Sequence, residues 1–389
     1  MAKINSRDRY SGVFFLAMLA QFVFFASIHL LMWTLPLYIS LKFPSATEVG
    51  LIIGLMAVSA VLLRPWAGAW ADRYGRKVLL VAGAVATGIA PLFYLAGGSF
   101  PLLAVGRLIQ GAGICLFTTG YGALIPDITQ PSRRGEAIGL ASITMPLSLM
   151  IMPRVGAAVQ EHYGFAPLFV ASCLVAAVAL SVSLVLPRGN YSGQSGARPV
   201  SFRSVLRMRR LWAALAAVAS LALAWGALLA FLPLFAESRG IAGGSYFFLG
   251  YGLAQVAASY SVGGLSDRYG RARLIVPGML GVAVALVLVS RVSSLAPLLV
   301  LAPVIGLLFG AAKISLDAFC VDSVPVEGRG AVVSLEFAVF DAGIGLGSFG
   351  LGAVADALGY GNMFVAMSGL ILAGLLTFVF LHRRNGRAA

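Results

Sequence analysis

The sequence predicts an all-α polytopic membrane protein with twelve transmembrane helices arranged as two pseudo-symmetric six-helix bundles. Of its 389 residues, 60% are hydrophobic and only 11% are charged, with a mean hydropathy of +0.93. Soluble domains carry about 25% charged residues, so the solvent around most of this chain must be lipid. Apolar runs, the distribution of basic residues and an internal repeat then specify the arrangement.

Each apolar run is about 20 residues long, which lets a helix cross ~30 Å of hydrocarbon. The first run is too long for a signal peptide, so we expect an uncleaved helix. A polar segment with six arginines follows the sixth run, which predicts bundles at 1–186 and 211–389 joined by a basic cytoplasmic linker at 187–210. The predicted spans begin near Ser11, Thr47, Val78, Leu102, Ala137, Ala166, Leu211, Tyr246, Leu274, Ala296, Ala331 and Gly361.

The basic residues fix the predicted orientation. With both termini in the cytoplasm, 21 of the 28 Lys and Arg fall in inner segments and three in outer loops. This is the positive-inside signal of a multi-pass protein of the cell (inner) membrane, and it accounts for the net charge of +14. We therefore expect no nucleic acid as a partner. The partner that these observations predict is the lipid bilayer, and we expect a monomer.

Neither metal nor cofactor chemistry is expected. The three cysteines and three histidines are scattered along the chain, without the spacing of a zinc site or a disulfide framework. The segment 345–350 fits G-x-G-x-x-G formally, but it lies inside an apolar span with no strand before it. Because ATP-binding and hydrolase motifs are also missing from the sequence, we expect a protein that is not an enzyme and that uses an ion or solute gradient.

An internal repeat at a constant offset of 195 residues relates the two halves. The segment 68–77, GAWADRYGRK, recurs as GGLSDRYGRA at 263–272. Two homologous halves that both begin in the cytoplasm are related by an axis along the membrane normal, as in transporters that move two bundles around a site at mid-depth. The same offset maps two further charged residues onto their counterparts, Asp127 onto Asp322 and Arg134 onto Arg329.

The segment 68–77 matches the signature G-x-x-x-D-R-x-G-R-K of the major facilitator superfamily, and the sequence resembles this family over nearly its whole length. The resemblance implies a carrier that works by alternating access. It also implies that Asp72 meets the positive start of span 11 and that Arg76 pairs with Asp127. Gly68 would permit close approach of helices.

The repeat extends these expectations to the second half. Asp267 would meet the start of span 5, and Arg271 would pair with Asp322. All four contacts are expected to cross the cytoplasmic face, to latch the outward-open state and to break when the inner side opens. The alternative is that these charges only set topology, which would explain the basic residues but not the acids. The candidate gating residues are Gly68, Asp72, Arg73, Gly75, Arg76, Asp127, Arg134, Gly263, Asp267, Arg268, Gly270, Arg271, Asp322 and Arg329.

Two further patterns resemble the twelve-span drug or sugar:proton antiporters, the efflux branch of the family. The segment 106–111 opens span 4 with Arg107 and Gln110, and it resembles a motif whose intramembrane arginine is associated with proton coupling. The alternative is that Arg107 snorkels to the outer interface. Arg154 is expected near that interface. At the six positions of the antiporters' glycine pattern in span 5, this chain matches at Gly139, Pro153 and Gly156, has the small residues Ser148 and Ala157, and departs at Met152.

Asp341 is the first candidate for a proton-linked site. It lies ~15 Å along span 11, and the first half has no acid at mid-depth. An unpaired carboxylate at the bilayer centre is costly, which favours uptake of a proton. The alternative is a packing carboxylate bonded to nearby backbone. Glu336, Lys313 and Asp317 are candidates for the same cavity or for a structural ion-pair cluster. His29 is a candidate for the cavity wall or the interface.

The sequence therefore predicts a secondary active transporter of a small solute, with proton-coupled efflux of a drug, sugar or metabolite as the leading function. The first alternative is an importer or uniporter. A remote alternative is a membrane receptor or enzyme that has the same fold without transport. A cavity that contains both Arg107 and Asp341 does not select the charge of the substrate.

Overall fold

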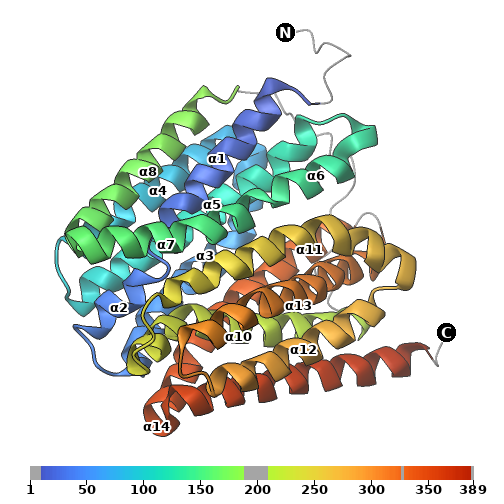
Figure 1. Ribbon diagram of the computed structural model, residues 1–389. Coiled ribbons are helices and arrows are strands. Elements are labelled where there is room, and N and C mark those ends of the chain that lie inside the picture. The colour runs from blue at the N-terminus through green and yellow to red at the C-terminus, as the bar shows by residue number, and fades with distance from the viewer. Residues whose placement is uncertain (1–9, 188–208, 326–327, 387–389) are drawn as a thin grey trace.

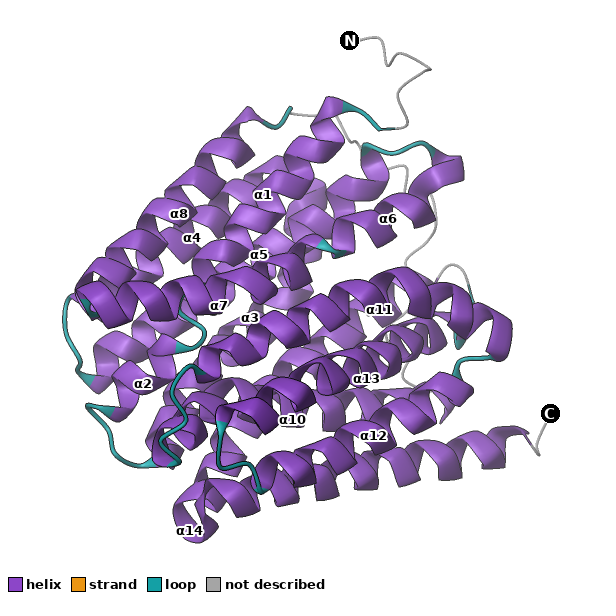
Figure 2. Ribbon diagram, in the orientation of Figure 1, coloured by secondary structure: helices purple, strands orange, loops and turns teal. Residues whose placement is uncertain are grey.

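A computed structural model describes residues 10–187, 209–325 and 328–386. Over this part of the chain the fold consists of helices joined by short loops, with no strand (Figure 2). The long helices lie roughly side by side and form two groups, α1 to α8 and α10 to α14 (Figure 1). The predicted all-α polytopic class is confirmed. Most of the predicted linker, residues 188–208, lies outside the described ranges.

The first half follows the six predicted spans closely. Two of these spans are each divided into two helices, the first by a turn at residues 30–33 and the fifth at Ile143. Pro36 stands in the first turns of the short helix that follows the first break, where a proline is tolerated. The helices are α1 (Gly12–His29), α2 (Thr34–Ser40), α3 (Ala46–Tyr74), α4 (Arg76–Leu95), α5 (Phe100–Asp127), α6 (Arg134–Ser142), α7 (Thr144–Tyr163) and α8 (Phe165–Val185).

The second half contains α10 (Arg209–Ser238), α11 (Phe247–Tyr269), α12 (Ala272–Ser290), α13 (Leu295–Asp322) and α14 (Arg329–Gly386). Helix α14 contains predicted spans 11 and 12. Its backbone leaves the helical region between them, at Gly359. Among the described residues, ten helices are long and apolar enough to cross a membrane; α14 counts once, and α11 is not one of them. Twelve crossings therefore remain a prediction, although each predicted span coincides with helix.

The sequence repeat is also a repeat of backbone conformation. Helices α3 and α11 end at Gly75 and Gly270, whose φ angles are +91° and +93°. Residues with a Cβ rarely adopt such angles, so a glycine at each position lets the chain turn sharply into the next helix. The chain turns again at Gly164 and Gly359, also 195 residues apart, with φ of +85° and +81°. The signature segment is thus a helix end, a glycine turn and a new helix start.

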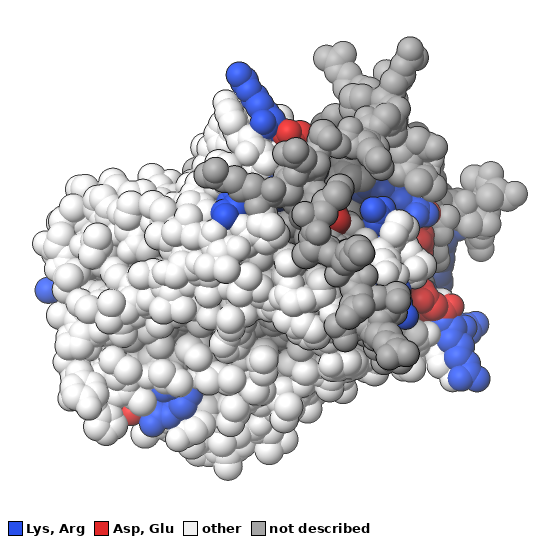
Figure 3. Space-filling model, turned by 90° about the horizontal axis from the view of Figure 1, so that it is seen from above, with Lys and Arg blue, Asp and Glu red and all other residues white. Residues whose placement is uncertain are grey.

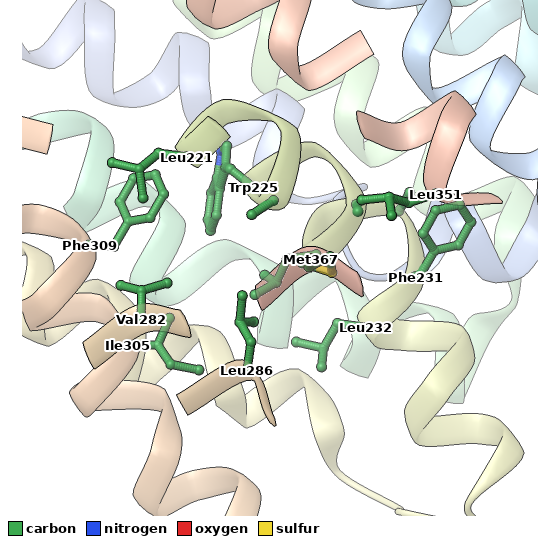
Figure 4. Packing of buried hydrophobic residues seen from close by; sticks show 14 of the residues in the cluster. Leu221, Trp225, Phe231, Leu232, Val282, Leu286, Ile305, Phe309, Leu351 and Met367 are labelled. Carbon is green, nitrogen blue, oxygen red and sulfur yellow. The ribbon is translucent and has the colours of Figure 1, made fainter. Parts of the chain in front are cut away.

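Helix α10 is the centre of the second half. Figure 4 shows side chains of α10 packed among residues of α12, α13 and α14. The indole of Trp225 stacks on Tyr251 of α11 with ring centroids 4.9 Å apart, and it lies 5.5 Å from the ring of Phe309. Close packing of this kind stabilises helices in lipid, where apolar burial supplies little driving force between them.

Charged side chains gather toward the end of the molecule at which α14 terminates, and a broad uncharged surface covers the middle (Figure 3). The helices also carry strongly exposed leucines, for example Leu174, Leu253 and Leu376, each more than 60% exposed. Such a surface suits hydrocarbon. Following the predicted orientation, we call the end where α3 begins the outer end, and the end where α3 terminates the inner end.

The two halves meet along α3 with α14 and along α7 with α11. Helices α3 and α14 are antiparallel, and small residues allow their backbones to touch. A Cβ on Gly54 would lie 2.8 Å from the carbonyl oxygen of Gly345, and one on Gly50 would overlap the carbonyl oxygen of Ser348. Larger residues would separate the halves here.

We expect Gly156→Ala to destabilise the protein, because the added methyl would overlap the carbonyl oxygen of Leu30 in the neighbouring chain segment. Overpacking of this kind costs about 1–3 kcal/mol. Gly139→Ala is the matched control, since a Cβ there meets nothing within 4 Å. Thermal unfolding of both variants in detergent checks this: Gly156→Ala should melt several degrees lower, and equal melting temperatures would contradict the packing argument.

Candidate functional site

The outer ends of the two halves are in contact. The rings of Trp33 and Phe248 meet edge to face at 6.3 Å, and the guanidinium of Arg154 lies 4.8 Å from the ring centroid of Tyr246. Arg154 lies midway along α7, and it also pairs at 3.0 Å with Glu161, near the outer end of that helix. These contacts join α7 and the turn before α2 to the start of α11 and the residue before it, so they close the outer side.

The inner end is not latched in this conformation. The side chains of Asp72 and Asp267 are 66% and 67% exposed, and each pairs with the arginine four residues later, Arg76 or Arg271. The family resemblance and the repeat led us to expect each carboxylate against a helix start of the opposite half. Neither carboxylate is buried in that way here. An outer end in contact and an inner end without this latch correspond to an inward-facing arrangement.

The predicted pairs Arg76–Asp127 and Arg271–Asp322 are present, each with Nε to Oδ2 at 3.1 Å. However, each pair lies within one half and is intact here. The prediction that these two pairs join the halves and break when the inner side opens is wrong. Arg76 also donates to the carbonyl of Ala71 at 2.8 Å, so it ties the end of α3 to α4 and α5.

The remaining gating candidates stay close to their own segment. Arg73 and Arg268 lie over the rings of the tyrosines that follow them, at 5.3 and 5.5 Å, and Arg134 donates to the carbonyl of Pro126. A Cβ on Gly68 would meet nothing within 4 Å, and the same holds for Gly263. Close helix approach at Gly68 is therefore not seen in this state. The gating roles of Gly75, Gly270 and Arg329 stay predictions.

Arg107 points into the protein, so the alternative that it snorkels outward is wrong. It is 6% exposed, and it donates to Gln110 Oε1 at 2.7 Å and to the carbonyl of Ile53 at 2.8 Å. The hydroxyl of Tyr94 donates to the same amide oxygen at 3.2 Å. Arg107 thus ties α5 to α3 in the first half.

A small cavity of about 50 Å³ lies next to Arg107, between the two halves. It is mostly apolar, and both halves contribute to its wall. Its wall includes residues of the turn at 30–33 and of the start of α2, so it lies on the outer side of the fold. The lining residues are Ile28, Leu31, Met32, Leu35, Pro36, Ile53, Met56, Arg107, Leu229 and Ile344.

Asp341 is not an unpaired carboxylate, which corrects the sequence prediction. Arg64 of α3 donates to Asp341 Oδ2 through Nε at 3.0 Å and also through Nη2, and the side chains are 9% and 16% exposed. The guanidinium carbon lies 5.1 Å from the ring centroid of Phe337. This ion pair joins the two halves on the inner side of the Gly54–Gly345 contact.

Sequence reasoning missed Arg64 as a site residue. A signal for it existed, because Arg64 is one of four basic residues inside the predicted spans. It lies ~15 Å before the end of α3, and Asp341 lies ~18 Å after the start of α14, so the two depths agree in an antiparallel pair. What the sequence did not specify is that α3 and α14 would place these two side chains face to face.

Lys313, Asp317 and Glu336 form a compact cluster between α13 and α14. Lys313 Nζ lies 2.6 Å from Asp317 Oδ1 and 2.7 Å from Glu336 Oε1, and it is 4.7 Å from the ring centroid of Phe340. Glu336 is only 4% exposed. All of these residues belong to the second half. The cluster therefore matches the structural ion-pair alternative, and it does not join the two halves.

His29 packs between α1 and α7. It is 2% exposed, its Nδ1 lies 2.9 Å from the Ser148 hydroxyl, and its ring stacks on Phe25 at 5.5 Å. It is therefore enclosed by the first half rather than placed at the membrane interface. The partial match to the antiporter pattern thus includes Ser148 as a hydrogen-bond partner.

We expect Lys313→Met to destabilise the protein, because it leaves the buried Glu336 carboxylate without its cation and close to the partly exposed carboxylate of Asp317. Removing one partner of a buried pair costs about 3–5 kcal/mol. Adding Glu336→Gln should restore part of the loss, since it removes one of the two uncompensated charges. Thermal unfolding of the single and double variants provides the measurement, and a double variant less stable than Lys313→Met would contradict this arrangement.

Sequence comparisons agree with this architecture. The model of the Major Facilitator Superfamily matches residues 17–261 and 243–389. Multidrug resistance protein 1 of Bacillus subtilis is 28% identical over 175 residues, 44% of this chain and 45% of that protein. Quinolone resistance protein NorA of Staphylococcus aureus is 24% identical over 165 residues, 42% of each chain. The matched stretch therefore spans less than half the length of these relatives.

Solved structures show the same fold. A bacterial homolog of the human lysosomal transporter Spinster, solved in an inward-facing and unoccupied conformation, has a TM-score of 0.80 at 18% identity, covering 97% of this chain and 98% of that one. A mutant of the nucleoside transporter NupG has a TM-score of 0.79 at 13% identity, covering 95% and 100%.

Proposed function

This chain belongs to the Major Facilitator Superfamily, and from that premise we propose that it is a proton-coupled exporter of a small solute. The family to which segment 68–77 pointed is confirmed. We propose that the chain works as a multi-pass membrane transporter and not as an enzyme, in agreement with the transporters whose fold it shares. We further propose that it lies in the inner membrane with both termini in the cytoplasm, acts as a monomer and needs no cofactor.

The ion pair between Arg64 and Asp341 carries the proposal. The Asp341 carboxylate is titratable and largely buried, and it is held by an arginine of the opposite half. Proton uptake by Asp341 removes its charge, and Arg64 then loses its ionic partner. Because the pair joins α3 to α14, its strength contributes to the relative stability of the two conformations. A proton bound on one side and released on the other would thus drive the conformational cycle.

The direction of transport is argued from the relatives. Two of them are named for multidrug and quinolone resistance, and both match this chain over less than half of their length. This supports efflux of a drug or metabolite over the alternative of an importer or uniporter. Counterflow in proteoliposomes tests transport itself, since a receptor or enzyme on this fold would show no solute exchange.

We expect Asp341→Asn to uncouple transport from the proton gradient. The amide mimics the protonated acid, so substrate exchange should persist while accumulation driven by a pH gradient falls to a ratio near one. Proteoliposomes with an imposed pH gradient provide the measurement. The double variant Arg64→Gln/Asp341→Asn is the control for an unpaired buried arginine, and it should be uncoupled in the same way but more stable than Asp341→Asn.

The comparison variant is Glu336→Gln, whose partners all lie in the second half. It should lower stability while keeping the dependence on pH. Full pH-driven accumulation by Asp341→Asn, together with uncoupling by Glu336→Gln, would reverse the two roles. If neither variant changes the dependence on pH, the protein is a uniporter or couples through another group, and the proposal of proton-coupled efflux fails.

A further inference from the structure

Asp356 stands three residues before the bend of α14 at Gly359, at the outer end of the first arm of this helix. It accepts four hydrogen bonds from the start of α3. The hydroxyls of Ser45 and Thr47 donate to Oδ2, both at 2.6 Å, and the Thr47 amide donates to the same oxygen at 2.9 Å. The amide of Ala46 donates to Oδ1 at 2.7 Å. Thus one carboxylate of the second half occupies the N-terminus of a long helix of the first half.

The physical reason for this contact lies in the helix start. The first amides of a helix have no carbonyl partner within the helix, and the end carries a partial positive charge. Residue Ser45 is the N-cap of α3, yet its hydroxyl does not cap its own helix. The cap is supplied by Asp356 instead. A cap from within one half would persist in every conformation, whereas this one exists only while the outer ends of α3 and α14 touch.

The same two helices meet again at their inner ends, with the roles exchanged. Because α3 and α14 are antiparallel, Asp72 in the last turn of α3 is placed to reach the start of α14 when the inner ends close. In the present conformation Asp72 is 66% exposed and bonded to Arg76, while Asp356 is seated on α3. One carboxylate is engaged at the outer end and the other is released at the inner end.

We propose that Asp356 with Ser45, Ala46 and Thr47 forms an outer latch that stabilises the inward-facing state. It opposes the latch expected of Asp72, so the two carboxylates compete through one helix pair. The proposal rests on the alternating access proposed above. In this proposal Asp356 contributes to the balance between the two states. It belongs neither to the family signature at 68–77 nor to the central ion pairs.

The internal repeat supplies an independent observation. Glu161 precedes Asp356 by the repeat offset of 195 residues, and it lies at the outer end of α7, beside the start of α11. Its carboxylate pairs with Arg154, whose guanidinium lies over the ring of Tyr246, the residue before α11. Both inter-half seams therefore carry an acid at the same outer position. At the second seam the acid acts through an arginine, so its contribution to the closed outer side is smaller.

Distances between spin labels test the outer latch without any substrate. In a variant without native cysteines, one pair of labels at Ser99 and Ser293 reports on the outer ends, and a second pair at Ser132 and Arg273 reports on the inner ends. All four side chains are exposed. Double electron–electron resonance gives the populations of short and long distances for each pair in lipid nanodiscs.

Asp356→Ala should raise the ratio of outer-open to outer-closed molecules roughly fivefold, as the loss of one helix cap predicts. The inner labels should approach each other to the same extent. Asp72→Ala should shift both pairs in the opposite direction, and the double variant should return toward the parent. Glu161→Ala should shift the balance in the same direction as Asp356→Ala, by a smaller factor.

A second route removes the donors and leaves the carboxylate in place. Ser45→Ala/Thr47→Val should shift the balance in the same direction as Asp356→Ala, by a smaller factor, because the two backbone amides remain. If Asp356→Ala and this variant leave the distances unchanged while Asp72→Ala still shifts them, the outer latch is overturned and alternating access stands. If Asp72→Ala also has no effect, the proposed alternating access fails as well.

Discussion

The antiparallel contact between α3 and α14 is the constraint on which the rest of this structure depends. Small residues bring the two backbones together near Gly54 and Gly345, and this proximity lets charged side chains reach across the two halves. Arg64 meets Asp341 on the inner side of this contact, and Asp356 meets the start of α3 on the outer side. A single pair of helices thus holds the central ion pair and the Asp356 cap.

Ion pairs in this protein divide into two classes by what they join. Pairs such as Arg76–Asp127 and Lys313–Glu336 lie within one half, where they fix neighbouring helices relative to each other. A half held together in this way can move as a rigid body. The pair Arg64–Asp341 and the Asp356 cap join different halves. They therefore stabilise only the conformations that bring these groups together. Rigid halves with few, specific inter-half contacts suit alternating access.

Low dielectric explains why the charged residues inside the described spans have charged or polar partners. In hydrocarbon a buried charge without a partner is expensive, so each such residue constrains which helix can lie beside it. Arg107 shows the same rule with neutral partners, because an amide oxygen and a backbone carbonyl accept hydrogen bonds from its Nη1 and Nη2 groups. The few charges in the spans therefore contribute to the choice of helix neighbours as well as to coupling.

The fold class and most helix positions could be predicted from the sequence because they depend on local properties. Apolar length, turn glycines such as Gly75 and Gly270, and the offset of 195 residues are all visible in one dimension. The pair Arg76–Asp127 followed from the family resemblance, and the repeat extended it to Arg271–Asp322. The cluster around Lys313 was one of two alternatives that the sequence left open.

The tertiary structure alone decided which residues of different halves meet. Asp341 looked unpaired because its partner Arg64 is 277 residues away, and no periodicity within one helix links them. The sequence does not indicate the contact of Asp356 for the same reason, since its partners at the start of α3 lie in the other half. The sequence by itself determined the helices, their predicted depth in lipid and the repeat. Inter-half contacts depend on the conformation in which two rigid bodies pack, and only the assembled structure contains that information.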